Sequence, residues 1–209
     1  KLAQIKLKKA TFYDGINEFL KLREMLMQEM LSWKKLLSSD DYCAIPFINA
    51  DGYHSKTVAY SIWHIIRIED IVVNSLIRRK KEVLYENNFD KKIGADIITT
   101  GNELVKQEIA EFSKKLNIEA LYEYALSVKA STDEWLKSIH YEDIKKKFGD
   151  DDKKRISELG VVSDDESAVW LIDYWCNKDI SGLIKMPLSR HWIMHIEAAN
   201  RIKEKLLDK

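Results

Sequence analysis

The chain has 209 residues, of which 45% are hydrophobic, including six Trp, nine Tyr and six Phe. This composition supports one domain, residues 1–209, with a sizeable core. Lysine plus arginine and aspartate plus glutamate both number 34, so the formal net charge is zero. This balance gives no electrostatic basis for binding nucleic acid or an acidic membrane, and we expect neither as a partner.

The two cysteines, Cys43 and Cys176, are far apart and belong to no C-x-x-C pair. The sequence therefore predicts neither a disulfide framework nor a zinc knuckle, and Cys176 is interpreted as a small buried hydrophobe rather than a nucleophile. No apolar run approaches the roughly 18 residues that a membrane-spanning helix requires. Together these features favour a reduced, cytoplasmic protein.

Few helix breakers occur, with only seven Gly and two Pro, and apolar residues recur with helical spacing along four long segments. These expected helices run from about Ala10 to Leu37, from Lys56 to Arg79 with Ser55 as N-cap, from about Ile118 to Ile139, and from Leu188 to Leu207 with Pro187 in the first turn. No segment carries a clear strand pattern. The prediction is an all-α bundle of four long helices.

The connections between these helices differ in length. Residues 38–55 are expected to form a loop that helps to cover a pocket, and residues 80–101 a polar crossover before a further helical stretch from Asn102 to Leu116. Between residues 140 and 187 the pattern is broken into short pieces, among them a short helix from Glu166 to Cys176. We therefore expect additional short helices inserted between the third and fourth long helices.

Two of the five histidines, His191 and His195, lie four residues apart in the last expected helix. Four residues advance an α-helix by about 400°, so the two imidazoles would lie on nearly the same face, where one cation could bind both. Chance alone can also produce this spacing in a chain with five histidines. A metal site therefore requires a third ligand from elsewhere in the chain.

His64, in the second expected helix, is the candidate for that ligand. If the four long helices alternate in direction, the second and fourth run the same way, and His64 lies at a height similar to that of His191 and His195. Three neutral imidazoles would leave coordination positions open for water or substrate, as in catalytic metal sites. The alternative is a core histidine bonded to a backbone carbonyl, the commoner outcome for a lone histidine.

Three segments resemble the DinB-like family and follow its order: W-H-I-x-R-x-E-D at residues 63–70, E-L-G-V-V at 158–162, and M-P-L-S-R-H at 186–191. The resemblance spans most of the chain. It implies a four-helix bundle that holds a divalent metal, commonly nickel or zinc, with one histidine from the second helix and an H-x-x-x-H pair from the fourth. By this resemblance the metal ligands are His64, His191 and His195.

The same resemblance extends to thiol-dependent transferases and isomerases and to metal-dependent hydrolases. A bound Zn²⁺ or Ni²⁺ ion could lower the pKa of a bound water or thiol and polarise a substrate carbonyl. We therefore expect a small-molecule substrate, favour a low-molecular-weight thiol as co-substrate, and expect a homodimer formed through an exposed helix face. The alternative is a non-catalytic, stress-associated interaction module whose metal site is structural or vestigial.

Several residues near the histidines have two interpretations. Arg67 could face the same cavity and hold an anionic group, or it could pair with an acid. Glu69 and Asp70 could accept the second N–H of a ligand histidine. Four aromatic residues could line a pocket or pack in the core: Trp63, Trp192, Tyr174 and Trp175. The two remaining histidines, His54 and His140, are not expected to be ligands.

Overall fold

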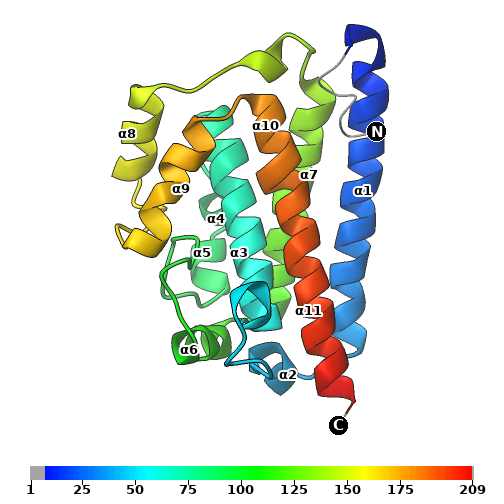
Figure 1. Cartoon of the computed structure of the whole chain (residues 1–209), viewed down its shortest axis with the longest axis vertical. Coiled ribbons are helices and arrows are strands. Elements are labelled where there is room, and N and C mark those ends of the chain that lie inside the picture. The colour runs from blue at the N-terminus through cyan, green and yellow to red at the C-terminus, as the bar shows by residue number, and fades with distance from the viewer. Residues whose placement is uncertain (1–7, 209) are drawn as a thin grey trace.

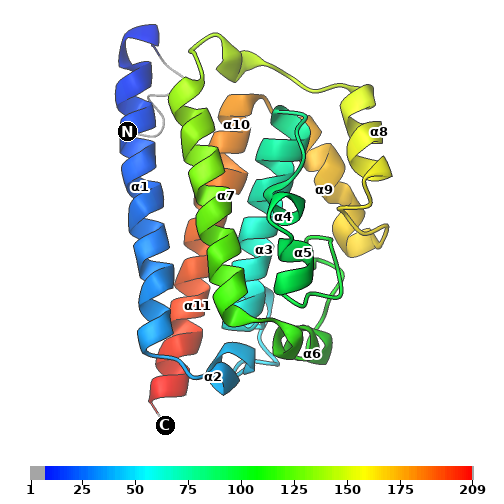
Figure 2. The same cartoon turned by 180° about the vertical axis from the view of Figure 1, so that it is seen from behind.

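The computed structural model describes residues 8–208, so the expected domain ends at residues 1 and 209 lie outside the described part. Residues 8–208 form helices and connecting segments without a strand, which confirms the all-α prediction. Four long helices lie side by side along the molecule: α1 (Phe12–Ser32), α3 (Val58–Asp70), α7 (Ile118–Ser138) and α11 (His191–Leu207) (Figures 1 and 2).

The second long helix begins later than the sequence predicts. Its N-cap is Thr57, whose Oγ1 accepts a hydrogen bond of 2.9 Å from the backbone N–H of Tyr60. The expected cap, Ser55, instead donates its hydroxyl to the carbonyl of Gly52. Beyond Asp70 the helix continues as a π-helical turn, Ile71–Ile77, so a helical backbone extends close to the predicted end.

The last long helix begins earlier than predicted. Helix α10 (Ile180–Lys185) is capped by the side chain of Asp179 and continues through a π-helical segment, Met186–Arg190, into α11. Pro187 therefore lies within a helical run rather than in its first turn. Proline has no N–H to donate, and the wider π turn accommodates it without ending the helix.

The expected alternation of helix directions is wrong. Helices α1 and α11 run one way, whereas α3 and α7 both run the other way (Figure 1). The cause is the connection between α3 and α7, which carries the chain back along the molecule. Its short helices are α4 (Val83–Glu86), α5 (Phe89–Lys92) and α6 (Gln107–Lys115).

The predicted insertion before the last long helix is confirmed. It contains a 3₁₀ turn (Asp143–Lys145), α8 (Asp150–Glu158) and α9 (Glu166–Cys176), the last with the predicted bounds. Apolar residues of this insertion, including Leu171 and Trp175, pack with Ile68 and Ile71 of the second long helical run. The insertion therefore forms a wall beside α3.

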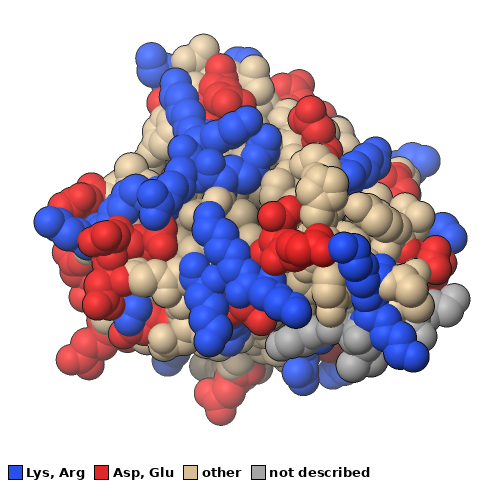
Figure 3. Space-filling view, turned by 90° about the horizontal axis from the view of Figure 1, so that it is seen from above, with Lys and Arg blue, Asp and Glu red and all other residues tan. Residues whose placement is uncertain are grey.

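The connection between α1 and α3 completes the fold. It holds a 3₁₀ turn (Trp33–Lys35), the short helix α2 (Ser39–Cys43) and a second 3₁₀ turn (Gly52–His54); a further 3₁₀ turn (Lys9–Thr11) precedes α1. Across residues 8–208, no helix combines the length and the apolar character needed to span a bilayer. On the face seen in Figure 3, basic and acidic side chains lie close to one another.

Candidate metal centre

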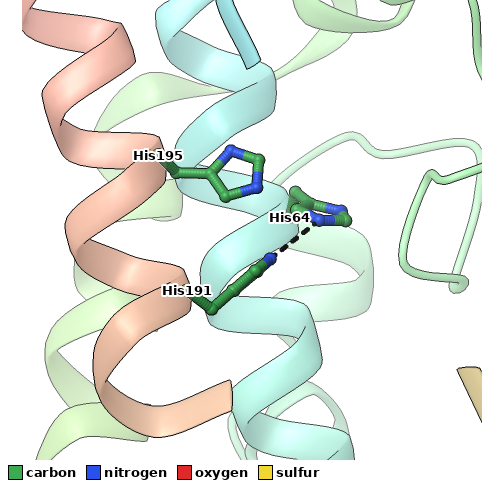
Figure 4. A group of neighbouring side chains, drawn as sticks. All are labelled: His64, His191 and His195. Atoms are coloured by element: carbon green, nitrogen blue, oxygen red, sulfur yellow. Dashed lines mark hydrogen bonds between the residues drawn. The ribbon is translucent and has the colours of Figure 1, made fainter. Parts of the chain in front are cut away.

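The three predicted histidines meet inside the helical core. His64 points from α3 toward His191 and His195, which project from successive turns of α11 (Figure 4). The Nε2 atoms of His64 and His191 are 3.2 Å apart, and one nitrogen from each of the three rings lies within 4.8 Å of the others. In a tetrahedral zinc site with bonds of about 2.0–2.1 Å, two nitrogens lie roughly 3.3 Å apart. The group could therefore hold a metal ion.

The three histidines converge although α3 and α11 do not run parallel. Helices α3 and α11 are antiparallel, and residues 180–190 precede His191 in the last helical run. These added turns place His191 part-way along the molecule, beside the first half of α3. The three residues were thus predicted correctly to converge, although the directions assumed for their helices were wrong.

A backbone carbonyl orients His64. Its Nδ1 lies 2.8 Å from the carbonyl oxygen of Thr100, an acceptor, so Nδ1 carries the proton. The lone pair of Nε2 then faces the other two imidazoles, which is the arrangement that metal-binding histidines have when their second nitrogen is hydrogen-bonded. The ring of Tyr60 stacks on the His64 ring at 5.5 Å between centroids and further restricts it.

Burial keeps all three imidazoles neutral near pH 7. It lowers the pKa of His64 to about 4, even though the bond to Thr100 opposes this change, and the charge of Lys56 lowers it further. Burial also holds the pKa values of His191 and His195 well below their usual range, and the neighbouring histidines add to this effect. Neutral imidazole is the form that coordinates metal ions.

Several imidazole nitrogens have no hydrogen-bond partner. Among the described residues nothing pairs with Nδ1 of His191 or with either nitrogen of His195. Leaving a buried polar atom unpaired costs about 1–3 kcal/mol. A coordinated cation would satisfy one nitrogen of each ring, so the donor set fits a metal ion.

Loops and α9 surround the histidines. The ring of Tyr53, from the connection before α3, lies edge-on to His195 with 4.6 Å between centroids, so the predicted loop does help to cover a pocket. A cavity of about 210 Å³ beside the cluster is lined by all three histidines and mostly by aromatic and apolar side chains, with Asn102 as the other polar residue: Tyr53, Ile68, Asn102, Trp170, Leu171, Tyr174, Trp175, Met186 and Pro187.

Arg67 does not line this cavity. It is fully buried, donates to the carbonyl of Ile98 and pairs with the carboxylate of Glu82 at 2.7 Å. The expectation of an anion contact by Arg67 is corrected in favour of the alternative pairing with an acid. The pairing is buried rather than on the surface, because the crossover after α3 brings Glu82 against the helix.

Glu69 and Asp70 also have other partners. Glu69 binds the guanidinium of Arg23 through two hydrogen bonds of 2.7 and 2.8 Å. Asp70 accepts from Tyr124 and from the backbone N–H groups of residues 83 and 84. The acceptor that orients His64 is a backbone carbonyl, so neither carboxylate has the role considered from the sequence.

The remaining candidates divide between pocket and core. Tyr174 and Trp175 line the cavity, as does Trp170, which the sequence did not single out. Trp63 and Trp192 are fully buried; the former packs on Phe112 and the latter under Arg23.

The other histidines and the cysteines lie apart from the cluster. His54 packs edge-on against Phe47, and the exposed His140 bonds Tyr13, so neither joins the metal-ligand group. Cys176 is buried, and this burial raises the pKa of its thiol to about 11, which fits an inert side chain.

The site contains residues that sequence reasoning missed. Tyr60 precedes His64 by one helical turn, so the i, i+4 spacing could have indicated their contact. Thr100 and Asn102 lie in irregular segments and Tyr53 in a short 3₁₀ turn, and no periodic signal places such residues beside a given helix.

Comparison with known proteins shows a shared fold. No family model matches the chain, and no curated protein matches it. Its structure is similar to one described as the crystal structure of a conserved protein of locus from Enterococcus faecalis. The TM-score is 0.61, with 13% sequence identity, over 92% of this chain and 97% of the other. At this identity the likeness shows the shared fold alone.

Proposed function

We propose that this protein binds one divalent transition-metal ion through His64, His191 and His195. The observation that carries the proposal is the convergence of three buried, neutral imidazoles whose facing nitrogens lie within 4.8 Å of one another. The Thr100 carbonyl holds the His64 tautomer that presents Nε2 to the group. Because imidazole ligands suit zinc and nickel, these are the metals we expect.

We further propose that the chain is a DinB-like metal-dependent enzyme acting on a small molecule. The motif runs that resemble this family contain all three histidines, and the arrangement is all-α. No fourth His, Cys, Asp or Glu joins the group among residues 8–208. A three-histidine set beside a cavity is typical of catalytic rather than closed structural metal sites.

The chemistry would be thiol transfer or hydrolysis. A bound zinc or nickel ion supplies a Lewis acid that favours the deprotonated form of a thiol or water. The chain itself holds the three imidazoles neutral, and the cavity beside them offers mostly aromatic and apolar side chains to the reacting group. A low-molecular-weight thiol remains our favoured co-substrate, with its sulfur end entering this cavity.

Metal binding is tested by titrating metal-free protein with Zn²⁺ and Ni²⁺ and by elemental analysis after dialysis. Wild-type protein should retain one ion per chain, and His64→Ala and His191→Ala should not. The matched control is His140→Ala, which removes an exposed histidine outside the cluster. A free metal concentration of about 100 times the dissociation constant should also raise the free energy of unfolding of the wild type by about 2.7 kcal/mol. Failure of wild-type protein to retain either metal would refute the proposal.

Catalysis is tested separately, on zinc-loaded and nickel-loaded protein. Thiols of increasing size would be combined with electrophiles, and simple esters and amides would be assayed for hydrolysis. We expect turnover that disappears in His191→Ala and on metal removal. Tight metal binding without any turnover would instead support the non-catalytic interaction module.

A further inference from the structure

Two cavities meet at the histidine cluster. Beside the aromatic cavity lies a second one of about 280 Å³, formed by the connection before α3 and the start of that helix. Four residues line both cavities and so form their shared wall: Tyr53, His64, Asn102 and His195. A ligand bound at the histidines can therefore have one part in each cavity.

The two cavities differ in charge. Apart from the histidines, the aromatic cavity has no ionisable group except the hydroxyls of Tyr53 and Tyr174. Its volume of about 210 Å³ is below the roughly 300–1,000 Å³ of pockets for drug-sized ligands, so it suits a small apolar group. The second cavity is lined by Lys56 and by the hydroxyl-bearing residues Ser55 and Tyr60.

Lys56 is the cation of the second cavity. Its ammonium lies 5.2 Å from the centroid of the Tyr60 ring, which in turn stacks on His64. Among residues 8–208, no carboxylate lies within ion-pair distance of this ammonium. Burial lowers the pKa of Lys56, and its charge reaches both His64 and His195, whose pKa values it also lowers. A partly buried cation without an acid beside it favours an anionic ligand.

We propose that Lys56 binds the anionic group of the natural ligand. That ligand is a small organic anion whose apolar part occupies the aromatic cavity while its reacting group lies at the three histidines. This inference rests on the proposed metal site and assigns to Lys56 the role that the sequence suggested for Arg67.

Binding of matched small molecules to zinc-loaded protein tests the inference by calorimetry. The probes are 3-phenylpropanoate, its neutral amide, and 2-phenylethylphosphonate, which share an apolar group and differ in the polar end. Wild-type protein should bind the better of the two anions about tenfold to a hundredfold more tightly than the amide, the range for a hydrogen bond to a charged group. Comparison of carboxylate with phosphonate identifies the preferred anion.

Because a carboxylate could also bind the metal directly, variants must separate the two contacts. Lys56→Met removes the charge and keeps the length of the side chain, and Lys56→Arg restores a cation. The control is Lys92→Met, since Lys92 makes the same kind of contact with Phe89, at 5.4 Å, outside both cavities. The preference for the anion should be lost in Lys56→Met and kept in the other two variants.

Metal content of each protein is measured beside every titration. The inference is overturned if zinc-loaded wild type shows no preference for either anion, if Lys56→Met keeps the preference, or if no probe binds at millimolar concentration. In those cases, wild-type protein that holds one zinc ion per chain still supports the proposed metal site. Absence of zinc from wild type refutes the proposed function instead, and anion binding to this metal-free protein that requires Lys56 would still support the Lys56 contact.

Discussion

Replacing Glu69 with Gln should destabilise the protein strongly, because Glu69 neutralises a fully buried arginine. Both side chains of the Arg23–Glu69 pair have no exposed surface, and two hydrogen bonds of 2.7 and 2.8 Å join them. The substituted glutamine would keep one acceptor, but its amide N–H₂ would face a guanidinium N–H. Asp133, 2.6 Å from Nε of Arg23, still supplies one negative charge. From the 3–5 kcal/mol typical of breaking a buried pair, we expect a loss of about 3 kcal/mol.

Urea denaturation followed by circular dichroism measures this loss as the change in the free energy of unfolding. The control is Glu197→Gln, which removes the acid of an exposed pair with Arg201 on α11 and should cost less than about 0.5 kcal/mol. The double variant Arg23→Met, Glu69→Leu should recover part of the loss, since it leaves no unpaired buried cation. The reasoning is refuted if Glu69→Gln costs no more than Glu197→Gln.

Two further predictions concern titratable groups away from the histidines. Burial raises the pKa of the Cys176 thiol to about 11, so iodoacetamide should modify the less buried Cys43 first at pH 8, as mass spectrometry of the native protein would show; equal rates would contradict this. Burial alone would raise the pKa of Asp152, but hydrogen bonds from Arg79 and the Gly149 N–H lower it below 3.8. Ionised Asp152 therefore stabilises the folded protein above pH 3.8, the pKa expected in the unfolded chain, and this stabilisation is lost as the pH falls through the lower pKa of the folded state. Asp152→Asn should cost roughly 1 kcal/mol at pH 7 and less at pH 2.5, and a pH-independent cost would contradict this.

Helical periodicity predicted the long helices but not all of their ends. Apolar spacing identified four long segments, and α9 has the predicted bounds. At the start of α3, however, Ser55 and Thr57 are both chemically able to cap. Only the observed backbone shows that the Thr57 oxygen meets the N–H of Tyr60. The choice between neighbouring capping residues depends on the loop before the helix, which has no periodic signal.

Helix directions depend on long connections, and the sequence does not determine their path. Residues 78–117 carry enough chain to cross the length of the molecule, so α3 and α7 run parallel. The predicted histidine triad survived this error because the His191–His195 pair was chosen by its spacing on one helical face, and the resemblance to the DinB-like family indicated His64 independently of helix direction. The triad lies at its observed height along the molecule because the final helical run is longer than predicted and begins at Ile180.

Partners of buried charges were the least predictable feature. Arg67 lies one turn after His64, and that spacing is compatible with a role at the site. Its actual acid, Glu82, is 15 positions later and reaches it only because the crossover folds back on α3. Lys56 was expected to begin the second long helix but lies in an irregular segment before it, and no pattern in the sequence indicated its closeness to the histidines.

The structure combines satisfied and unsatisfied polar groups in one core. The carboxylates of Glu69 and Asp70 on α3 accept several hydrogen bonds, whereas three nitrogens of His191 and His195 on α11 have no partner among the described residues. A core selected for stability alone would gain from apolar side chains at these two positions, since each unpaired nitrogen costs about 1–3 kcal/mol. The unpaired nitrogens lie where two cavities meet, so we infer that a bound cation offsets part of this cost by coordinating one nitrogen of each ring.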